Sequence, residues 1–159
     1  MVWKKENRLS ANESSKVMWE LVPYTRGRGV DVGCGPYKAF PHMIGVDNKK
    51  DEEMFRITMK PDLVAQADKL DMFADASMDF VYSSHTLEHI EDFQKVLREW
   101  WRVLRVDGHL VLYLPHKDLY PNKGSPDANP DHAHDFLPKD IVEAMKGIEI
   151  GRASCRERV

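Results

Sequence analysis

Short apolar runs, each about the length of a buried strand, alternate along the chain with segments in which apolar residues recur at helical spacing. The run HLVLYL at residues 109–114 is the most continuous, and DFVYS at residues 79–83 is nearly as apolar. Strands that are covered on both faces carry such runs, as the central strands of a parallel sheet do. The same pattern predicts further strands at residues 30–32, 43–46 and 62–66.

Residues 91–105 carry the clearest helical pattern of the chain. Their apolar side chains form one wide face with charged side chains opposite, which predicts an amphipathic helix packed on the sheet. Gly108 follows as the expected stop signal. The apolar face consists of Phe93, Val96, Leu97, Trp100, Trp101 and Leu104, and both tryptophans are expected to pack rather than to bind a ligand.

Two more helices are expected nearer the ends of the chain. Residues 10–21 contain good helix formers, with Ser10 or Asn12 available as a cap and Pro23 as a stop. Residues 137–145 start another helix, with Pro138 near its first turn. Between the first two strands, residues 36–42 include two prolines and leave room for at most about a turn or two of helix.

This order of strands, helices and loops indicates an α/β fold with a mostly parallel sheet. Ligands of such sheets bind outside the carboxyl ends of the strands. The chemistry of the chain is therefore expected at the residues that follow the predicted strands, namely Gly33, Cys34, Gly35, Asp47, Asn48, Asp68, Ser84, His85 and His116.

Composition and charge narrow the class of protein. The 159 residues are 42% hydrophobic and 31% charged, which is ordinary for one soluble domain with its own core. The formal net charge of -3, with scattered lysines and arginines, provides no basic field for a nucleic acid, so no such partner is expected. No apolar run is long enough to cross a membrane and the first residues lack a secretory pattern, so we expect a cytoplasmic protein without a membrane partner. Cys34 and Cys155 stand too far apart in sequence to indicate a paired metal motif.

The turn Gly33-Cys34-Gly35 is the centre of the predicted site. Its glycines let the backbone approach a ligand closely, and Asp47, which ends the next strand, can accept hydrogen bonds from both hydroxyls of a ribose. A dinucleotide site would also need a third glycine that opens a full helix and holds a pyrophosphate. The short proline-bearing loop found here favours a nucleoside cofactor without phosphates. For Gly-x-Gly alone, a tight structural turn is the alternative.

Several motifs in order carry a resemblance to a known family. The segments VDVGCGP, IGVD, DFVYSSHTLEHI and LREWWRVLRVDGHLVLYLP resemble the class I S-adenosylmethionine-dependent methyltransferases over residues 29–115. The spacing is similar to that of the methyltransferase type 11-like branch, in which the first helix is shortened. The resemblance implies a three-layer Rossmann-like fold with strand order 3-2-1-4-5. It also implies S-adenosylmethionine as the cofactor and methyl transfer as the activity.

The resemblance assigns roles to individual residues. Asp31 and the glycine turn match the motif that wraps the methionine part of the cofactor, and Asp47 matches the acid that holds the ribose hydroxyls. Asp68 matches the acid that pairs with the adenine amine, although the segment that follows it is shorter than usual and Asp71 stands close behind. Asp107-Gly108 replaces the family's usual Gly-Gly, a departure in a turn. The expected cofactor contacts are Asp31, Gly33, Cys34, Gly35, Asp47, Asn48, Asp68 and Ser84.

His85 and His116 are the expected catalytic residues. His85 matches the end of the fourth strand, where the family places groups around the methyl and the incoming nucleophile. In the implied fold, the loop at residues 118–135 lies over the methyl, so that a nearby histidine can act as general base. A solvated loop and a bound divalent metal are the alternatives that the sequence leaves open for this histidine-rich region, which contains His116, Asp131, His132, His134 and Asp135.

The residues His85-Thr86-Leu87-Glu88-His89 also satisfy H-x-x-E-H, which on a helix would hold zinc for peptide hydrolysis. They follow directly on a predicted strand, so His85 is expected at a strand end rather than inside a helix. No metal is therefore expected at this motif. Glu88 and His89 are expected to hold the loop in place.

The last residues change the expected domain organisation. Residues 150–159, IGRASCRERV, resemble the translation of a sequencing adapter, which leaves residues 1–149 as an incomplete methyltransferase domain. A natural basic tail is the alternative. If the tail is foreign, the last two strands of the family's sheet are missing. The strand at residues 109–114 would then be an exposed edge that promotes association.

The expected function is methyl transfer from S-adenosylmethionine to a small-molecule or glycan-type acceptor. The sulfonium supplies the electrophile, so the protein mainly aligns a nucleophile and excludes water. A non-catalytic cofactor-binding or scaffold domain is the alternative from another class, and a zinc hydrolase is a third. The sequence names neither the acceptor nor the oligomeric state.

Overall fold

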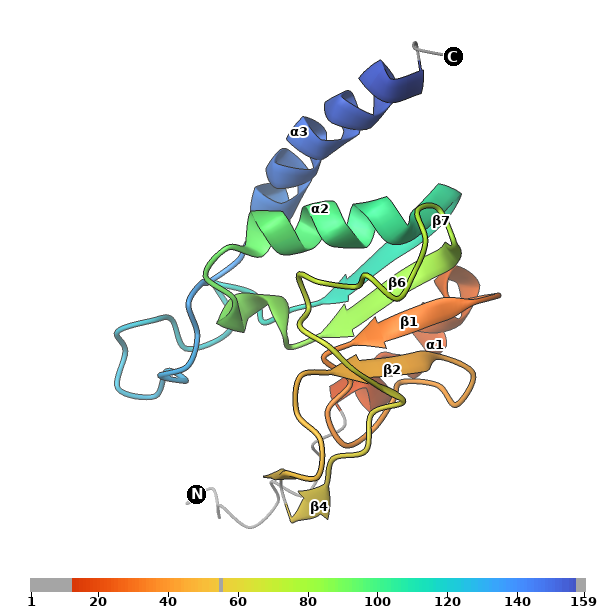
Figure 1. The fold of residues 1–159 in the computed structure, drawn as a ribbon. Helices are drawn as coiled ribbons and strands as arrows, with labels where there is room; N and C mark the ends of the chain where they lie inside the picture. The colour runs from red at the N-terminus through yellow and green to blue at the C-terminus, as the bar shows by residue number, and fades with distance from the viewer. Residues whose placement is uncertain (1–12, 55, 157–159) are drawn as a thin grey trace.

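The computed structural model describes residues 13–54 and 56–156, which are organised around a five-stranded sheet in the order β5-β2-β1-β6-β7 (Figure 1). Every strand pair in this sheet is parallel. The predicted Rossmann-like α/β fold and its strand order are thereby confirmed. The strands are β1 (Gly29–Val32), β2 (Ile44–Asp47), β5 (Leu63–Val64), β6 (Met78–Ser84) and β7 (Leu104–Tyr113).

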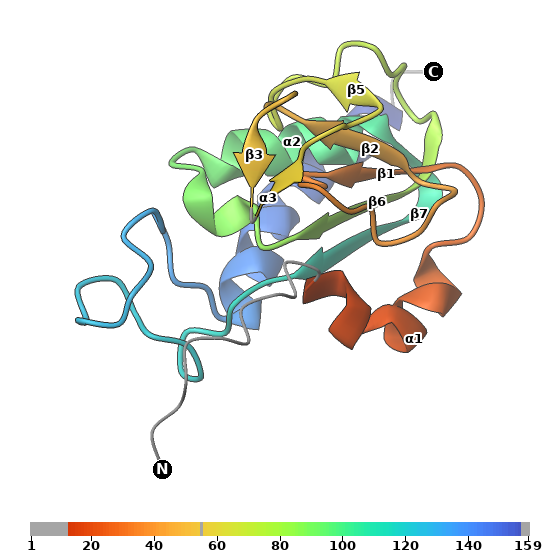
Figure 2. The ribbon, with the colours of Figure 1, turned by 90° about the horizontal axis from the view of Figure 1, so that it is seen from below.

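The centre of the sheet is buried on both faces, as its apolar runs predict. All of β1 is buried, and successive residues of β6 point to opposite faces, as the strand period requires. Val81 belongs to the larger core cluster on one face, whereas Phe80 and Tyr82 belong to a smaller cluster on the other. Figure 2 shows helix α2 (Phe93–Val103) on one side of the sheet and α1 (Met18–Leu21) on the other, which gives three layers.

Helix α2 (Phe93–Val103) forms where the amphipathic pattern predicts it. The Asp92 side chain caps it by accepting a hydrogen bond from the Lys95 N–H at 3.0 Å. Trp100 is fully buried and donates its Nε1–H to the Ala67 carbonyl at 2.9 Å, which confirms a packing role. The predicted stop at Gly108 is wrong. The backbone becomes extended at Leu104, which begins β7 directly, and Gly108 lies inside that strand.

The predicted helix at residues 10–21 is broken into short pieces. They are the 3₁₀ turn η2 (Glu13–Lys16), α1 (Met18–Leu21) and the 3₁₀ turn η3 (Val22–Tyr24). Buried contacts fix this segment, because Ser14 accepts a 2.8 Å hydrogen bond from the Tyr82 hydroxyl. Pro23 lies within η3 rather than ending a helix, and the expected caps Ser10 and Asn12 lie outside the described residues.

Residues between the strands differ from expectation in detail. The loop at residues 36–42 contains no helix, in line with its prolines. The strand predicted at residues 62–66 is only the two-residue β5. The segment before it forms an antiparallel pair of strands, β3 (Glu53–Met54) and β4 (Ile57–Thr58). The hydrophobic pattern does not predict this pair.

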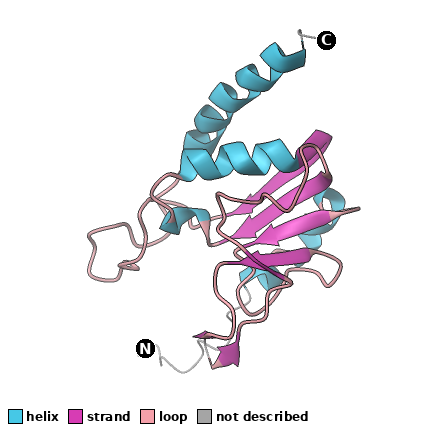
Figure 3. Ribbon diagram, viewed as in Figure 1, coloured by secondary structure: helices cyan, strands magenta, loops and turns pink. Residues whose placement is uncertain are grey.

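Strand β7 lies at an edge of the sheet formed by the described residues, and α3 (Pro138–Arg156) follows beyond it (Figure 3). Leu110 and Leu112, expected to be buried, are only partly covered, because β7 has a neighbouring strand on one side. Helix α3 starts at Pro138 as predicted but continues past residue 145, and the foreign origin of residues 150–159 stays a prediction. No helix in the described ranges combines the length and apolar character needed to cross a membrane.

Candidate functional site

The carboxyl ends of β1 and β2 are joined by backbone hydrogen bonds. The N–H groups of Gly33 and Cys34 both donate to the Val46 carbonyl, at 2.8 Å and 3.2 Å. The Gly35 N–H donates to Oδ2 of Asp47 at 3.0 Å. The glycine turn is therefore folded over the end of β2 and brings Asp47 beside it, as the sequence predicts.

The two glycines of the turn are needed for different reasons. Both have a positive φ, 74° at Gly33 and 56° at Gly35, where a side chain is strained. A Cβ on Gly33 would lie 2.8 Å from the Cβ of Thr86 and closer still to its hydroxyl oxygen, so this glycine allows the turn to pack against the segment after β6. Among the described residues, a Cβ on Gly35 would meet only the Met54 sulfur, at 4.0 Å. Gly35 thus borders open space, where backbone can approach a ligand.

The side chains of Asp31 and Cys34 lie beneath the turn. Asp31 is 2% exposed and accepts a 2.8 Å hydrogen bond from the Ala39 N–H, and burial raises the pKa of its carboxyl to about 7. Burial likewise raises the pKa of the Cys34 thiol to about 12, and the thiol contacts the Gly35 carbonyl. In the structure, both side chains fix the shape of the loop after β1.

Three further predicted cofactor residues lie along the ends of β2 and β5. Asp47 is partly exposed, and its Oδ1 accepts a 3.0 Å hydrogen bond from the Lys49 N–H. Asn48 donates to Oε1 of Gln66 at 3.4 Å, which links the loops after these strands. Asp68 forms a 2.7 Å ion pair with Lys95 of α2, and this hydrogen bond lowers the pKa of Asp68. Its assignment to the adenine stays a prediction.

His85 follows β6 at the centre of the same edge. Its φ of 50° lies in the left-handed region, which is strained for a residue with a side chain and is found preferentially at functional sites. Its N–H donates to the Tyr113 carbonyl at 2.9 Å, and its ring meets the Tyr113 ring edge-on at 5.3 Å. The imidazole lies between two carboxylates, with Nδ1 3.4 Å from Oε1 of Glu88 and Nε2 4.0 Å from Oε2 of Glu13. Ser84, the last residue of β6, is partly buried beside it.

The H-x-x-E-H residues do not form one helix. Only Leu87–His89 is helical, as the 3₁₀ turn η4, and His85 precedes it, as expected for a strand end. The Glu88 carbonyl accepts hydrogen bonds from the N–H groups of Ala133 and His134, at 2.7 Å and 3.1 Å. The Glu88 backbone and the His89 ring, whose Nδ1 lies 3.0 Å from the Asp131 carbonyl, therefore contact the histidine-rich loop, whereas the Glu88 side chain forms no hydrogen bond with the described residues.

The other predicted histidines occupy separate positions. His116 follows β7, where its Nδ1 accepts a 3.2 Å hydrogen bond from the Asp118 N–H and its backbone bridges to Phe136. His134 contacts the Glu91 carbonyl at 2.9 Å. His132 is buried beside Glu88 and His89, and burial lowers the pKa of its imidazole. The sequence shows these residues in two separate motifs, but no periodicity could reveal that they meet.

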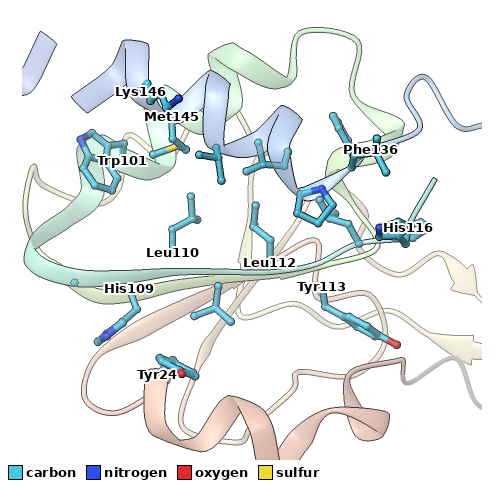
Figure 4. A pocket seen from close by; sticks show the side chains of 18 residues that line it. Tyr24, Trp101, His109, Leu110, Leu112, Tyr113, His116, Phe136, Met145 and Lys146 are labelled. Carbon is cyan, nitrogen blue, oxygen red and sulfur yellow. The ribbon is translucent and has the colours of Figure 1, made fainter. Parts of the chain in front are cut away.

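An apolar cavity of about 930 Å³ lies between β7 and α3. Figure 4 shows Leu110 and Leu112 facing Met145 across it, with Trp101 at one end and His116 at the other. Of the predicted site residues that the structure describes, His116 alone lines this cavity. The candidate site is therefore the edge formed by the glycine turn, Asp47 and His85.

Comparisons with known proteins agree with this geometry. A family model described as "Methyltransferase domain" matches residues 30–112. An uncharacterised protein of Methanocaldococcus jannaschii, MJ1123, is 28% identical over 91% of this chain and 73% of its own length. A SAM-dependent methyltransferase of Archaeoglobus fulgidus aligns with a TM-score of 0.62 and 20% identity over 85% of this chain and 68% of its own. A Thermotoga maritima SAM-dependent methyltransferase, described as a possible histamine N-methyltransferase, aligns with a TM-score of 0.66 and 19% identity over 84% of this chain and 69% of its own. Both structures share the fold.

Proposed function

The chain belongs to the methyltransferase domain family, whose methyl donor is S-adenosylmethionine, and we propose that it methylates a small-molecule or glycan-type acceptor held beside His85. The observation that carries this proposal is the position of His85. It follows β6, the strand between β1 and β7, in a strained conformation, and the next residue, Thr86, packs against the glycine turn. An acceptor beside His85 would therefore lie close to the place where the turn borders open space.

The residues of the turn fit S-adenosylmethionine. The space in front of Gly35 is one that a Cβ would begin to fill, so a ligand can lie against the backbone there. The partly exposed carboxylate of Asp47 uses one oxygen for Gly35 and the other for Lys49. Each carboxylate oxygen has a second lone pair, so Asp47 retains the capacity to accept hydrogen bonds from ribose hydroxyls.

When bound, S-adenosylmethionine supplies an electrophilic methyl group on its sulfonium. The protein then has to align the acceptor and exclude water, with a base to remove the acceptor's proton. An imidazole nitrogen of His85 can take a proton from a hydroxyl acceptor, and Oε1 of Glu88 lies 3.4 Å from Nδ1 of this ring. The η2 turn covers this edge from the other side, because Glu13 reaches His85 while Ser14 is buried on Tyr82.

Calorimetry with S-adenosylmethionine, followed by an acceptor screen, tests the proposal. We expect the chain to bind the cofactor, Asp47→Ala to weaken binding at least tenfold, and His85→Gln to retain binding. Turnover, followed as S-adenosylhomocysteine release from pools of small hydroxyl or carboxyl compounds and of glycans, should fall at least a hundredfold in His85→Gln.

His109→Gln is the matched control. His109 lies on β7, outside the candidate site, and its ring packs edge-on against Tyr24. It should leave both binding and turnover unchanged. Failure of the folded chain to bind S-adenosylmethionine would overturn the proposal. Turnover with RNA or protein pools alone would overturn the acceptor class while leaving the reaction intact.

A further inference from the structure

The fold brings together three side chains with metal-ligating groups that belong to no predicted cofactor contact. Glu88 and His89 come from the η4 turn and His132 from the histidine-rich loop, and one ligand atom from each lies within 4.8 Å of the others. Glu88 is 1% exposed and His132 is 5% exposed, whereas His89 lies at the surface. The cluster is thus largely buried, and its exposed member, His89, lies on the side from which an ion could reach the other two.

The carboxylate of Glu88 is the unusual member of this cluster. Both of its oxygens are buried, and neither accepts a hydrogen bond from the described residues. The neighbouring His85 nitrogen at 3.4 Å provides a counter-charge only when its imidazole is protonated. A buried carboxylate without a donor is costly, and buried charges are normally paired or coordinate a metal. An ion at this position would supply the missing partner for the carboxylate.

The ring of His89 is already oriented as a ligand. The Asp131 carbonyl lies 3.0 Å from Nδ1 of His89, and a carbonyl oxygen can only accept, so the hydrogen of this ring is on Nδ1. This leaves Nε2 of His89 as the free lone pair, and metal-binding histidines are commonly fixed by such a bond from their other nitrogen. The ring of His132 stacks on Tyr120, with 5.8 Å between ring centroids, and meets His89 edge-on at 4.8 Å.

We propose that Glu88, His89 and His132 bind a divalent first-row transition-metal ion. Two imidazoles and one carboxylate are a donor set typical of Zn²⁺ and its neighbours, whereas Mg²⁺ and Ca²⁺ prefer sets of oxygen ligands. Three protein ligands leave at least one coordination position for water or substrate. The set differs from the H-x-x-E-H helix, because the buried His132 takes the place that His85 would have there.

The frame of the site does not depend on the ion. The Glu88 carbonyl binds the N–H groups of Ala133 and His134, which places His132 against the η4 turn. An ion bound by His132 and Glu88 would close a side-chain link across the same junction. It would thereby fix the histidine-rich loop at the end of β6, next to His85.

Metal titration of the chelator-treated, folded chain tests the proposal without acceptor or S-adenosylmethionine. We expect Zn²⁺, Mn²⁺ and Co²⁺ each to bind with one ion per chain in calorimetry, and Co²⁺ to give visible absorption bands from nitrogen and oxygen ligands. Glu88→Gln and His132→Asn should each weaken binding at least tenfold. His89→Gln should do the same, and because His89 is exposed its loss leaves the core intact.

His134→Asn is the matched control, since His134 lies in the same loop but contacts Glu91 outside the cluster. It should bind the ions as the unaltered chain does. No ion bound by the folded chain, equal affinity in His89→Gln, or binding of Mg²⁺ or Ca²⁺ alone would each overturn the proposal. S-Adenosylmethionine binding, measured on the same samples, reports the proposed function separately, so the failure of one proposal is distinguishable from the failure of the other.

Discussion

Alanine substitution of the two glycines in the turn should separate a packing role from a ligand-binding role. An alanine at positive φ lowers the unfolding free energy by about 1–2 kcal/mol. A gain of about 0.4–1 kcal/mol offsets part of this loss, because alanine has less conformational freedom than glycine in the unfolded chain. Within the described part of the chain, the new methyl of Gly35→Ala meets only the Met54 sulfur at 4.0 Å, so its net loss of unfolding free energy should be about 1 kcal/mol. Gly33→Ala also places its Cβ 2.8 Å from the Cβ of Thr86, and such overpacking adds about 1–3 kcal/mol.

The expected order of stability is therefore Gly35→Ala above Gly33→Ala, measured as urea unfolding followed by circular dichroism. Binding of S-adenosylmethionine should show a different pattern. The added methyl of Gly35→Ala lies in the space assigned to the ligand, so its affinity should fall at least tenfold in calorimetry although the chain remains folded.

Gly124→Ala provides the control for backbone strain alone. Gly124 has a φ of 91° in the loop after β7, and a Cβ at this residue would have no atom of residues 13–54 or 56–156 within 4 Å. This variant should lose about as much stability as Gly35→Ala and keep full cofactor affinity. Normal affinity in Gly35→Ala would refute the assigned ligand space. Equal stability of Gly33→Ala and Gly124→Ala would refute the packing argument at Thr86.

Three other predictions concern the core and the sheet edge. Because burial raises the pKa of Asp31 from 3.8 to about 7, the folded state holds this proton more tightly, and the unfolding free energy should fall by up to about 4 kcal/mol as the pH rises through this interval. Asp31→Asn should lack this fall. The prediction would be contradicted if the urea midpoint changed equally between pH 5 and pH 8 in the unaltered chain and in Asp31→Asn. Trp100→Ala should cost about 3–5 kcal/mol and Trp101→Ala clearly less, since only Trp100 is fully buried; equal losses of unfolding free energy would contradict the packing. Light scattering should show concentration-dependent association, because β7 is an edge strand beside an apolar cavity; a monomer at high concentration would count against this expectation.

The sequence predicts the central part of the fold well, because burial on both faces leaves a simple pattern. The apolar runs of β1 and β6 mark strands that are covered by helices on either side. The β3–β4 pair has no such signal, since each strand has only two residues, one polar and one apolar, which is too short for a pattern. The break of the first helix is equally invisible, because this segment is held by a contact that is distant in sequence, the hydrogen bond between Ser14 and Tyr82.

The candidate site shows the same limit. Strand ends can be read from a pattern, so Gly35, Asp47 and His85 are found in sequence and do lie on one edge. The hydrophobic pattern of the sequence predicts the helix or strand on which a residue lies, but it does not predict which loop packs against that residue. The meeting of Glu88 with His132 depends on two backbone hydrogen bonds from the loop, which carry no residue preference of their own.

The segment at residues 85–89 connects the two proposed sites physically. Thr86 packs against Gly33 on the side of the glycine turn, and its hydroxyl hydrogen-bonds the Ser84 carbonyl at 3.1 Å. Glu88 belongs to the proposed metal site with His89 and His132, and it lies 3.4 Å from the ring of His85. An ion that engages the Glu88 carboxylate would compete with His85 for the same negative charge and would hold the η4 turn in one position. Removal of the ion should therefore change turnover through His85 more than it changes cofactor affinity at the glycine turn, because Glu88 lies directly beside the His85 ring, whereas Thr86 makes the contact with the turn.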